Sequence, residues 1–197
     1  YLQLAANQNN LDAQCFLGII YYEDLYITPD IYKSIHYFQL AANQNFDLAQ
    51  FYLGLIYYEG NHITRDMKKS IHYFTLAADQ NYLEAQLFLG FIYYGDIYVP
   101  CDIHKSIHFF TLAANKNSSY AQFFLGCIYY EGIYISANIN KSIYYFTLAA
   151  NQCHPEAQCF LGYIYLNEKS IQDIQKGIKY IQYSAENENR NAQQILA

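Results

Sequence analysis

Two histidines, His104 and His108, are spaced as a pair of metal ligands on one helix would be. Four residues are slightly more than one helical turn, so both imidazoles would point to the same side, with Cys101 and Asp102 just before them. No third and fourth ligand follow at a spacing typical of a metal site. Two exposed histidines are the simpler interpretation, and we predict no metal ion.

The nucleophiles of the chain form no recognisable catalytic arrangement. No GxSxG, P-loop or HExxH motif occurs, and the acidic residues fall where helix caps and loops are expected. The cysteines include no CxxC pair and their odd number cannot pair completely within one chain: Cys15, Cys101, Cys127, Cys153 and Cys159. We predict a non-catalytic protein without a cofactor, in a reducing compartment. This favours the cytoplasm, although the chain opens at Tyr1 inside a repeat and carries no readable targeting signal.

Charge and hydropathy exclude two classes of partner. The net charge is −6 and only 11 Lys and Arg are spread along the chain, too few to neutralise a row of phosphates. Apolar runs such as Phe16 to Tyr22 are about a third of the length that a bilayer span needs. We therefore expect no nucleic acid partner and no membrane segment.

The elements that carry these residues repeat along the chain. Leu-Gly pairs recur in steps of 36 residues, at Gly18, Gly54, Gly90, Gly126 and Gly162. An Ala-Ala pair and a lysine keep the same step until the last repeat, where it shortens to 35. Each unit contains two Pro-free segments with apolar residues three and four apart, which predicts two helices. We expect one domain over 1–197, of about five and a half repeats cut within a repeat at both ends.

The boundaries of the predicted helices have their own chemistry. An Asp or Asn precedes each first helix and can cap its free N–H groups: Asp30, Asp66, Asp102, Asn138 and Asp173. Asn stands at the turn between the two helices, where it tolerates a left-handed backbone, except in the fifth unit, which has Cys153. Gly inside the second helix costs about 1 kcal/mol against Ala, so its recurrence indicates a close helix crossing.

These residues resemble the Sel-1-like repeat, a relative of the tetratricopeptide repeat, over the whole chain. One unit carries the family's pattern in order: Ala49, Leu53-Gly54, Tyr57, Gly60, Asp66, Lys69-Ser70, Tyr73-Phe74 and Ala77-Ala78. Ser at position 70 and its equivalents departs from the family's Ala, and Asn replaces Gly at the turn between the helices. The resemblance implies an all-α, right-handed αα-superhelical solenoid of tandem 36-residue helix-turn-helix repeats, and an adaptor role in protein assemblies.

One polar face of the first helices is the candidate binding site. Positions 32, 36, 39 and 43 share this face, and in related solenoids the first helices line a concave groove that holds an extended peptide. The candidate residues, which we call the first-helix face, are His36, Gln39, His72, Thr75, His108, Thr111, Tyr144 and Thr147. The alternative for each residue is an ordinary solvated surface.

Two further features have structural interpretations. An apolar row on the second helices, including Cys15, Phe51 and Phe123, is interpreted as core, or as an interface if it is exposed. In three first helices the lysine has a glutamate ten residues earlier as an expected partner across the loop: Lys33 with Glu23, Lys69 with Glu59 and Lys141 with Glu131.

The sequence thus favours a non-catalytic scaffold that binds other proteins or peptides. The alternative is a substrate-recruiting arm of a larger ubiquitin-ligase or kinase-containing assembly. A small hydrolase or sugar-binding protein is less favoured, because no pocket of converging polar groups is indicated.

Overall fold

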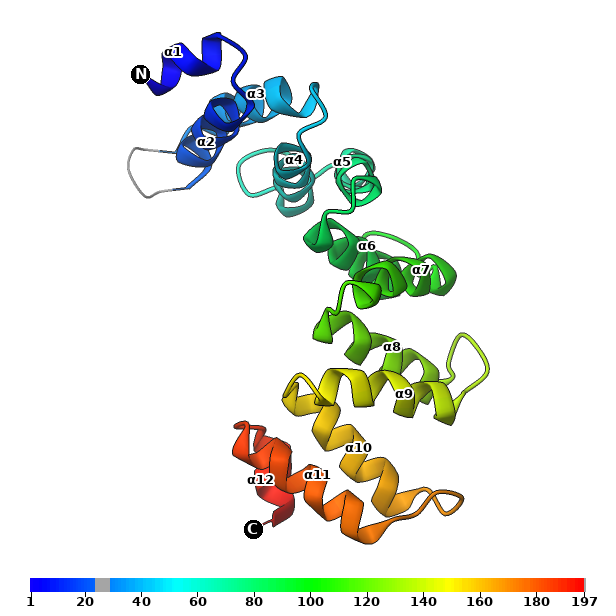
Figure 1. Ribbon diagram of the computed structural model, residues 1–197. Helices are drawn as coiled ribbons and strands as arrows, with labels where there is room; N and C mark the ends of the chain where they lie inside the picture. The colour runs from blue at the N-terminus through cyan, green and yellow to red at the C-terminus, as the bar shows by residue number, and fades with distance from the viewer. Residues whose placement is uncertain (24–28, 197) are drawn as a thin grey trace. The chain divides into compact units, whose positions relative to one another are not determined.

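The computed structural model describes residues 1–23 and 29–196, and the secondary structure of this part is entirely helical (Figure 1). The chain divides into two compact units, Tyr1–Asp102 and Ile103–Ala197. The helices of the first unit are α1 (Leu2–Asn7), α2 (Leu11–Tyr22), α3 (Ile31–Ala42), α4 (Asp47–Glu59), α5 (Met67–Asp79) and α6 (Leu83–Gly95). Those of the second are α7 (Ile103–Asn115), α8 (Ser119–Glu131), α9 (Ile139–Ala150), α10 (Pro155–Asn167), α11 (Ile174–Glu186) and α12 (Arg190–Leu196). The predicted all-α fold of tandem helix pairs is confirmed, whereas a single continuous domain stays a prediction.

The helix boundaries follow the predicted chemistry. The Oδ1 atoms of Asp30, Asp66, Asn138 and Asp173 accept the N–H of the residue three positions later at 2.9–3.1 Å, which caps α3, α5, α9 and α11. The turns between first and second helices have a left-handed residue at Asn45, Asn81 and Asn117, with φ of 61–68°. Cys153 has the same conformation, with φ of 60°, although it is not Asn. The change of residue in the fifth unit therefore leaves the turn unchanged.

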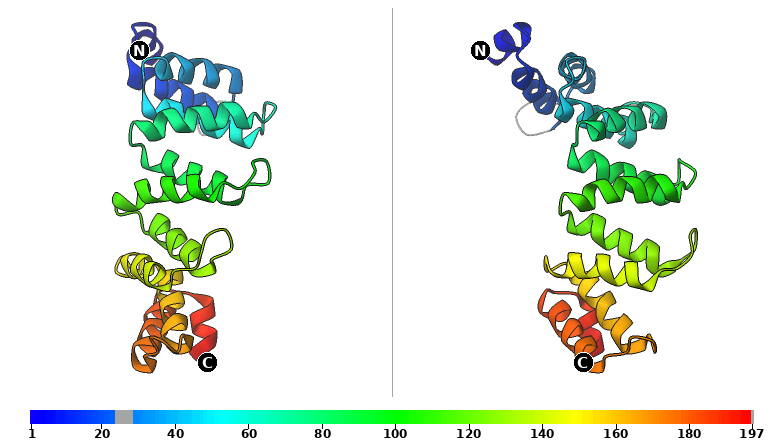
Figure 2. Two further views of the ribbon diagram at one scale, coloured as in Figure 1. Left: turned by 90° about the vertical axis from the view of Figure 1, so that its right-hand side faces the viewer. Right: turned by 45° about the vertical axis from the view of Figure 1, so that its right-hand side comes forward.

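A close contact between each second helix and the next first helix forms the core. A Cβ atom added to Gly54 of α4 would lie 2.6 Å from Cδ1 of Phe74 on α5, and one added to Gly126 would lie 2.5 Å from Cδ1 of Phe146. Both rings are fully buried. The recurring glycine is therefore required because a phenyl ring occupies the space of its missing side chain. Figure 2 shows the helices of each unit stacked one upon the next.

Buried glutamines join successive repeats, a feature that the sequence did not indicate. Gln50 Nε2 donates to the Ala42 carbonyl at 3.4 Å, and its Oε1 accepts from Gln80 Nε2 at 2.7 Å. In the second unit, Gln122 Oε1 accepts from Gln152 Nε2 at 2.7 Å in the same way. The Gln50 and Gln122 carboxamides thus each bond a helix-end carbonyl and the next repeat together, which satisfies these buried polar groups.

The predicted lysine partners are wrong for Lys33 and Lys69. Lys33 Nζ lies 3.1 Å from Asp30 Oδ2, and Lys69 Nζ lies 3.8 Å from Asp66 Oδ2, one helical turn away on the same helix. The Lys69 ammonium also lies 4.9 Å from the centroid of the Tyr57 ring. Glu59 instead accepts a hydrogen bond from the Tyr22 hydroxyl at 2.6 Å. The capping aspartate is simply nearer to each lysine than the glutamate across the loop.

The apolar row of the second helices is only partly in the core: Cys15 and Cys127 are buried, Phe51 and Phe123 are half-buried, and Phe91 is exposed. Cys15 is buried in a cluster with Phe38 and Leu53. The Phe51 ring lies 5.7 Å from the ring of Phe74, centroid to centroid. Phe123 packs against the corresponding cluster of the second unit. The row therefore contributes to the packing of each unit, while half-buried and exposed members such as Phe91 keep part of it accessible.

Candidate partner-binding face

Four of the eight residues of the first-helix face are exposed, and the other four are half-buried. His36 and His72, on α3 and α5 of the first unit, are exposed, and so are His108 and Tyr144, on α7 and α9 of the second. The other four residues are of intermediate burial: Gln39, Thr75, Thr111 and Thr147. All eight lie on first helices as predicted, and the structure separates them by exposure.

Hydrogen bonds hold two of the four half-buried residues. Thr111 of α7 hydrogen-bonds the Tyr145 hydroxyl of α9. Thr75 Oγ1 donates to the carbonyl of Ile71 within its own helix at 2.7 Å. Thr75 and Thr111 therefore take part in contacts within the helices, while His36, His72, His108 and Tyr144 are exposed.

The exposed rings rest on their neighbours in sequence. The His72 ring meets the Tyr73 ring edge-on, with centroids 5.3 Å apart, and the Tyr144 ring meets that of Tyr145 at 5.1 Å. His36 and His108 make the same contact with the aromatic residue that follows each of them. The rings are held in place while their outer faces stay in water.

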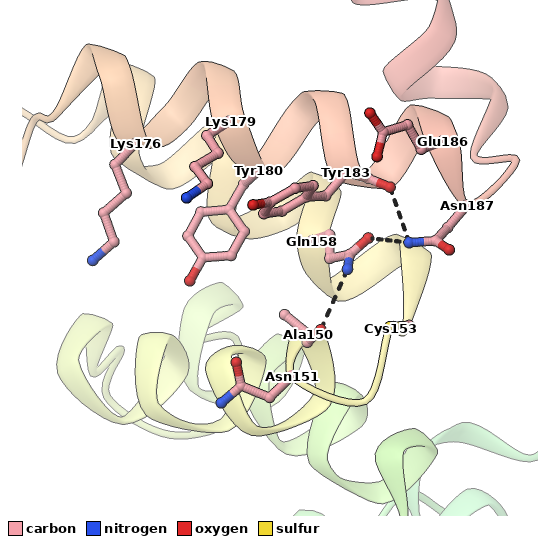
Figure 3. A pocket seen from close by; sticks show the side chains of 10 residues that line it. All are labelled: Ala150, Asn151, Cys153, Gln158, Lys176, Lys179, Tyr180, Tyr183, Glu186 and Asn187. Atoms are coloured by element: carbon pink, nitrogen blue, oxygen red, sulfur yellow. Dashed lines mark hydrogen bonds between the residues drawn. The ribbon is translucent and has the colours of Figure 1, made fainter.

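A pocket of about 470 Å³ lies beside this face in the second unit, between the end of α9 and helix α11 (Figure 3). Its lining residues are Ala150, Asn151, Cys153, Gln158, Lys176, Lys179, Tyr180, Tyr183, Glu186 and Asn187. The side chains of Lys176, Lys179 and Tyr180 extend from α11 toward the end of α9 that carries Asn151 (Figure 3). We call this cavity the α9–α11 pocket.

Hydrogen bonds fix the inner wall of the α9–α11 pocket. Asn187 Nδ2 donates to Gln158 Oε1 at 3.0 Å and to the Tyr183 carbonyl at 3.0 Å. Gln158 Nε2 in turn donates to the Ala150 carbonyl at 3.3 Å. Figure 3 shows these bonds closing the side of the cavity that faces α10. The pocket is therefore pre-formed on this side.

The outer wall is cationic. Lys176 Nζ donates to the Tyr165 hydroxyl at 2.8 Å and lies 4.1 Å from the centroid of that ring. The hydrogen bond to Tyr165 raises the pKa of Lys176 above its ordinary value, so its ammonium stays charged at neutral pH. Lys179 Nζ lies 5.5 Å from the centroid of the Tyr183 ring. Two positive charges thus stand one helical turn apart at the opening.

Three pocket residues belong to the predicted face, although the sequence interpretation stopped at the fourth repeat. Counting back 35 residues, Lys179 and Glu186 of α11 correspond to Tyr144 and Asn151 of α9. Asn151, Lys179 and Glu186 therefore continue the same helix face into the pocket. The shortened last step was visible in the sequence, and applying it to α11 identifies these residues.

The other candidate chemistry is not assembled. His104 and His108 are both exposed, and no group of three or more His, Cys, Asp or Glu side chains that could hold a metal ion occurs in the described part of the chain. Burial raises the pKa of the Cys15 and Cys127 thiols to about 12, so neither forms a thiolate at neutral pH. Within residues 1–23 and 29–196, no helix is both long and apolar enough to cross a bilayer.

Comparison with known proteins agrees with the repeat pattern. A family model described as Sel1 repeat matches five consecutive segments: residues 11–46, 47–82, 83–118, 119–152 and 155–189. A search of curated proteins found no match.

Solved structures share the fold. The chain is similar to a Sel1 repeat protein from Oxalobacter formigenes, with 28% identity, coverage of 94% of this chain and 76% of that chain, and a TM-score of 0.78. It is similar to c5321, a protective antigen of uropathogenic Escherichia coli with an SLR fold, at 25% identity, 98% coverage of this chain, 49% of that chain and a TM-score of 0.54. A sel1 repeat protein from Klebsiella pneumoniae subsp. pneumoniae has the same fold at 19% identity, with coverage of 98% and 94% and a TM-score of 0.56.

Proposed function

This chain belongs to the Sel1 repeat family, and from that premise we propose that each of its two units binds an extended segment of a partner protein at its own residues of the first-helix face. Sel1 repeat proteins are generally non-catalytic scaffolds for protein interactions. The observation that carries the finer proposal is the exposure of an aromatic or imidazole ring at the same position of four successive first helices: His36, His72, His108 and Tyr144.

The way the first-helix rings are held supports this choice of face. The exposed rings of His72 and Tyr144 lie edge-on against the ring of the next residue, which leaves their outer faces in solvent. Second helices carry half-buried rings such as Phe51 and Phe123 and exposed ones such as Tyr163, so the control variant is taken from a second helix. Aromatic and imidazole rings offer both apolar area and polar edges, which suits them to an extended peptide.

The test introduces charge on this face without disturbing the core. A His108→Asp, Tyr144→Asp double variant places two carboxylates where the partner would lie, and surface changes typically alter stability by about 0.5 kcal/mol each. Partners captured from a lysate of the source cells by the unmodified chain are identified by mass spectrometry and purified. Their binding to each variant is then measured by titration calorimetry. We expect the affinity of the double variant to fall at least tenfold.

Tyr163→Asp provides the matched control, because Tyr163 is also an exposed tyrosine of the second unit but lies on the second helix α10. It should bind the partner as the unmodified chain does. If Tyr163→Asp loses binding while the first-helix variant keeps it, the partner occupies the other face and the proposal is wrong.

A further inference from the structure

We propose that the α9–α11 pocket selects an acidic side chain with an apolar neighbour in the bound segment, so that the second unit recognises acidic–apolar peptide sequences. This inference rests on the proposed function and adds to it the chemistry of the partner. The charges, rings and amides that line the pocket support this inference.

The first support is the charge of the pocket opening. Lys176 and Lys179 are two of only 11 basic residues in a chain of net charge −6, and both line the α9–α11 pocket. At the position of Lys179, the preceding repeats carry Tyr144 and His108. The pocket therefore has a lysine at a position where the two preceding repeats have neither lysine nor arginine. A carboxylate is the group that completes this arrangement.

The single acid of the pocket leaves this charge in place. Glu186 follows Lys179 by seven residues on α11, which separates their backbones by about 10 Å along the helix axis. Over such a distance, water and salt screen most of the attraction between exposed groups. At the other end, Lys176 is bonded to the Tyr165 hydroxyl and lies one turn after Asp173, so Lys179 is the cation that attracts a carboxylate of another chain.

The rings beside the lysines supply the apolar part of the site. Tyr180 stacks on Tyr165 with centroids 6.0 Å apart, and Tyr183 is 41% exposed. Tyr183 stands where the preceding first helices carry Leu148 and Leu112. A flat ring replaces a branched aliphatic side chain at the wall of the pocket, and its face can pack against a side chain of the partner.

A second depression explains why an extended segment fits better than a small molecule. Lys176, Lys179 and Tyr183 also line a neighbouring depression, together with Asp173, Gln175, Ile178 and Gln182. The lysines therefore stand on a ridge that is accessible from both sides. A peptide that crosses α11 can place its carboxylate on this ridge and an apolar side chain against Tyr183 or the exposed Ile178. Asn151 and Lys179 connect this path with the first-helix face.

The experiment uses a random heptapeptide display library panned against the full chain. Sequencing of the enriched peptides should show Asp or Glu next to an aromatic or branched aliphatic residue. The most enriched peptide is then synthesised with a fluorescent label, and its binding is measured by fluorescence anisotropy. Lys179→Glu should weaken binding at least tenfold, and a peptide with its acid changed to Lys should regain part of the loss with this variant.

Lys169→Glu is the matched control, since it changes the net charge identically but does not line the pocket. It should bind as the unmodified chain does, and circular dichroism should show the same helix content for all variants. Succinate is the competitor that represents a small dicarboxylate, and at equal carboxylate concentration it should not displace the peptide.

Four outcomes overturn the inference: no enrichment, enriched peptides without an acidic residue, equal binding by the Lys179→Glu and Lys169→Glu variants, or displacement by succinate as effective as by unlabelled peptide. The proposed function is judged separately with the His108→Asp, Tyr144→Asp variant. If that variant loses the enriched peptides while Lys179→Glu keeps them, the face binds peptides and only the acidic selectivity is wrong. If both variants keep them, both proposals fail.

Discussion

At the residue scale, one turn carries a side chain that its backbone disfavours. Cys153 has a φ of 60°, where the equivalent turns have Asn45, Asn81 and Asn117. A left-handed backbone costs an ordinary L-residue about 1–2 kcal/mol, and Asn less because its side chain bonds locally. We expect Cys153→Asn to raise the free energy of unfolding by about 0.5–1 kcal/mol, measured by urea denaturation.

The converse variant tests the same reasoning. Asn117→Cys places the disfavoured side chain in an equivalent turn, where φ is 65°, and should lower the stability by a similar amount. Unchanged midpoints for both variants would show that the turn tolerates either residue and that the backbone argument fails.

A buried histidine makes the stability of the second unit depend on pH. His154 is 8% exposed, its ring stacks on Phe123 at 4.8 Å, and neither ring nitrogen has a hydrogen-bond partner among the described residues. Burial lowers the pKa of His154 below its ordinary value, and Glu156, 3.2 Å from Nδ1, offsets only part of this effect. The ring is therefore neutral in the folded state.

The sign of the pH effect follows from this lowered pKa. An unfolded histidine takes up a proton near pH 6.5, whereas the folded one does so only at lower pH. Between the two values the unfolded state binds more protons, so stability falls as the pH drops below about 6.5. His154→Tyr should remove this loss, because Tyr82 fills the same position in another repeat. The urea midpoints of the two proteins are measured from pH 5 to 8. The difference between them should be constant above pH 6.5 and should change below it. Parallel curves over the whole range would contradict the assignment.

At the element scale, the bulky side chain that faces a second helix selects its glycine: a Phe ring faces Gly18, Gly54 and Gly126, and Ile181 faces Gly162. A Cβ on Gly54 would lie 2.6 Å from the fully buried Phe74 ring, so Gly54→Ala forces the two helices apart or the ring off its rotamer. Such overpacking typically costs about 1–3 kcal/mol. Thermal unfolding should show a lower midpoint.

Gly95 offers the matched control within the same unit. It ends α6, and a Cβ added there meets nothing within 4 Å. Gly95→Ala should leave the melting temperature unchanged or raise it slightly, because Ala is the better helix former. Equal losses for Gly54→Ala and Gly95→Ala would mean that the close contact with Phe74 is not what selects glycine.

Sequence signals that act within a few residues were enough to predict the helices. They do not reveal hydrogen bonds between one repeat and the next. Asp30 and Asn45 act within one turn of their own position, so residue type and spacing were enough to place them. Gln50 looks like an ordinary surface residue in the sequence, but its partner Gln80 lies 30 residues away. Its recurrence after an alanine in every repeat was the available signal.

At the scale of the whole molecule, the common pattern predicted a shared face, while departures from the pattern form the pocket. His36, His72 and His108 were found by periodicity and lie exposed where expected. The α9–α11 pocket is lined by residues that differ from their equivalents, such as Cys153 and Tyr183. Describing all repeats by one common residue pattern hides these differences between single repeats. The general scaffold role of the family could therefore be predicted from the sequence, whereas the proposed selectivity of the pocket could be inferred only with the structure.

The interchangeable contacts between repeats also bear on how genes of this kind can change in length. Removal of residues 47–82 would join Phe46 to Leu83 and bring Gln86 eight positions after Ala42, the separation that Gln50 now has. The Gln86 carboxamide would then donate to the Ala42 carbonyl, as that of Gln50 does now. The new contact between repeats is therefore of the same kind as the one removed. An excision of half that length would instead bury a polar helix face. Recombination between repeats can thus shorten or extend the protein in steps of 36 residues while each intermediate still folds.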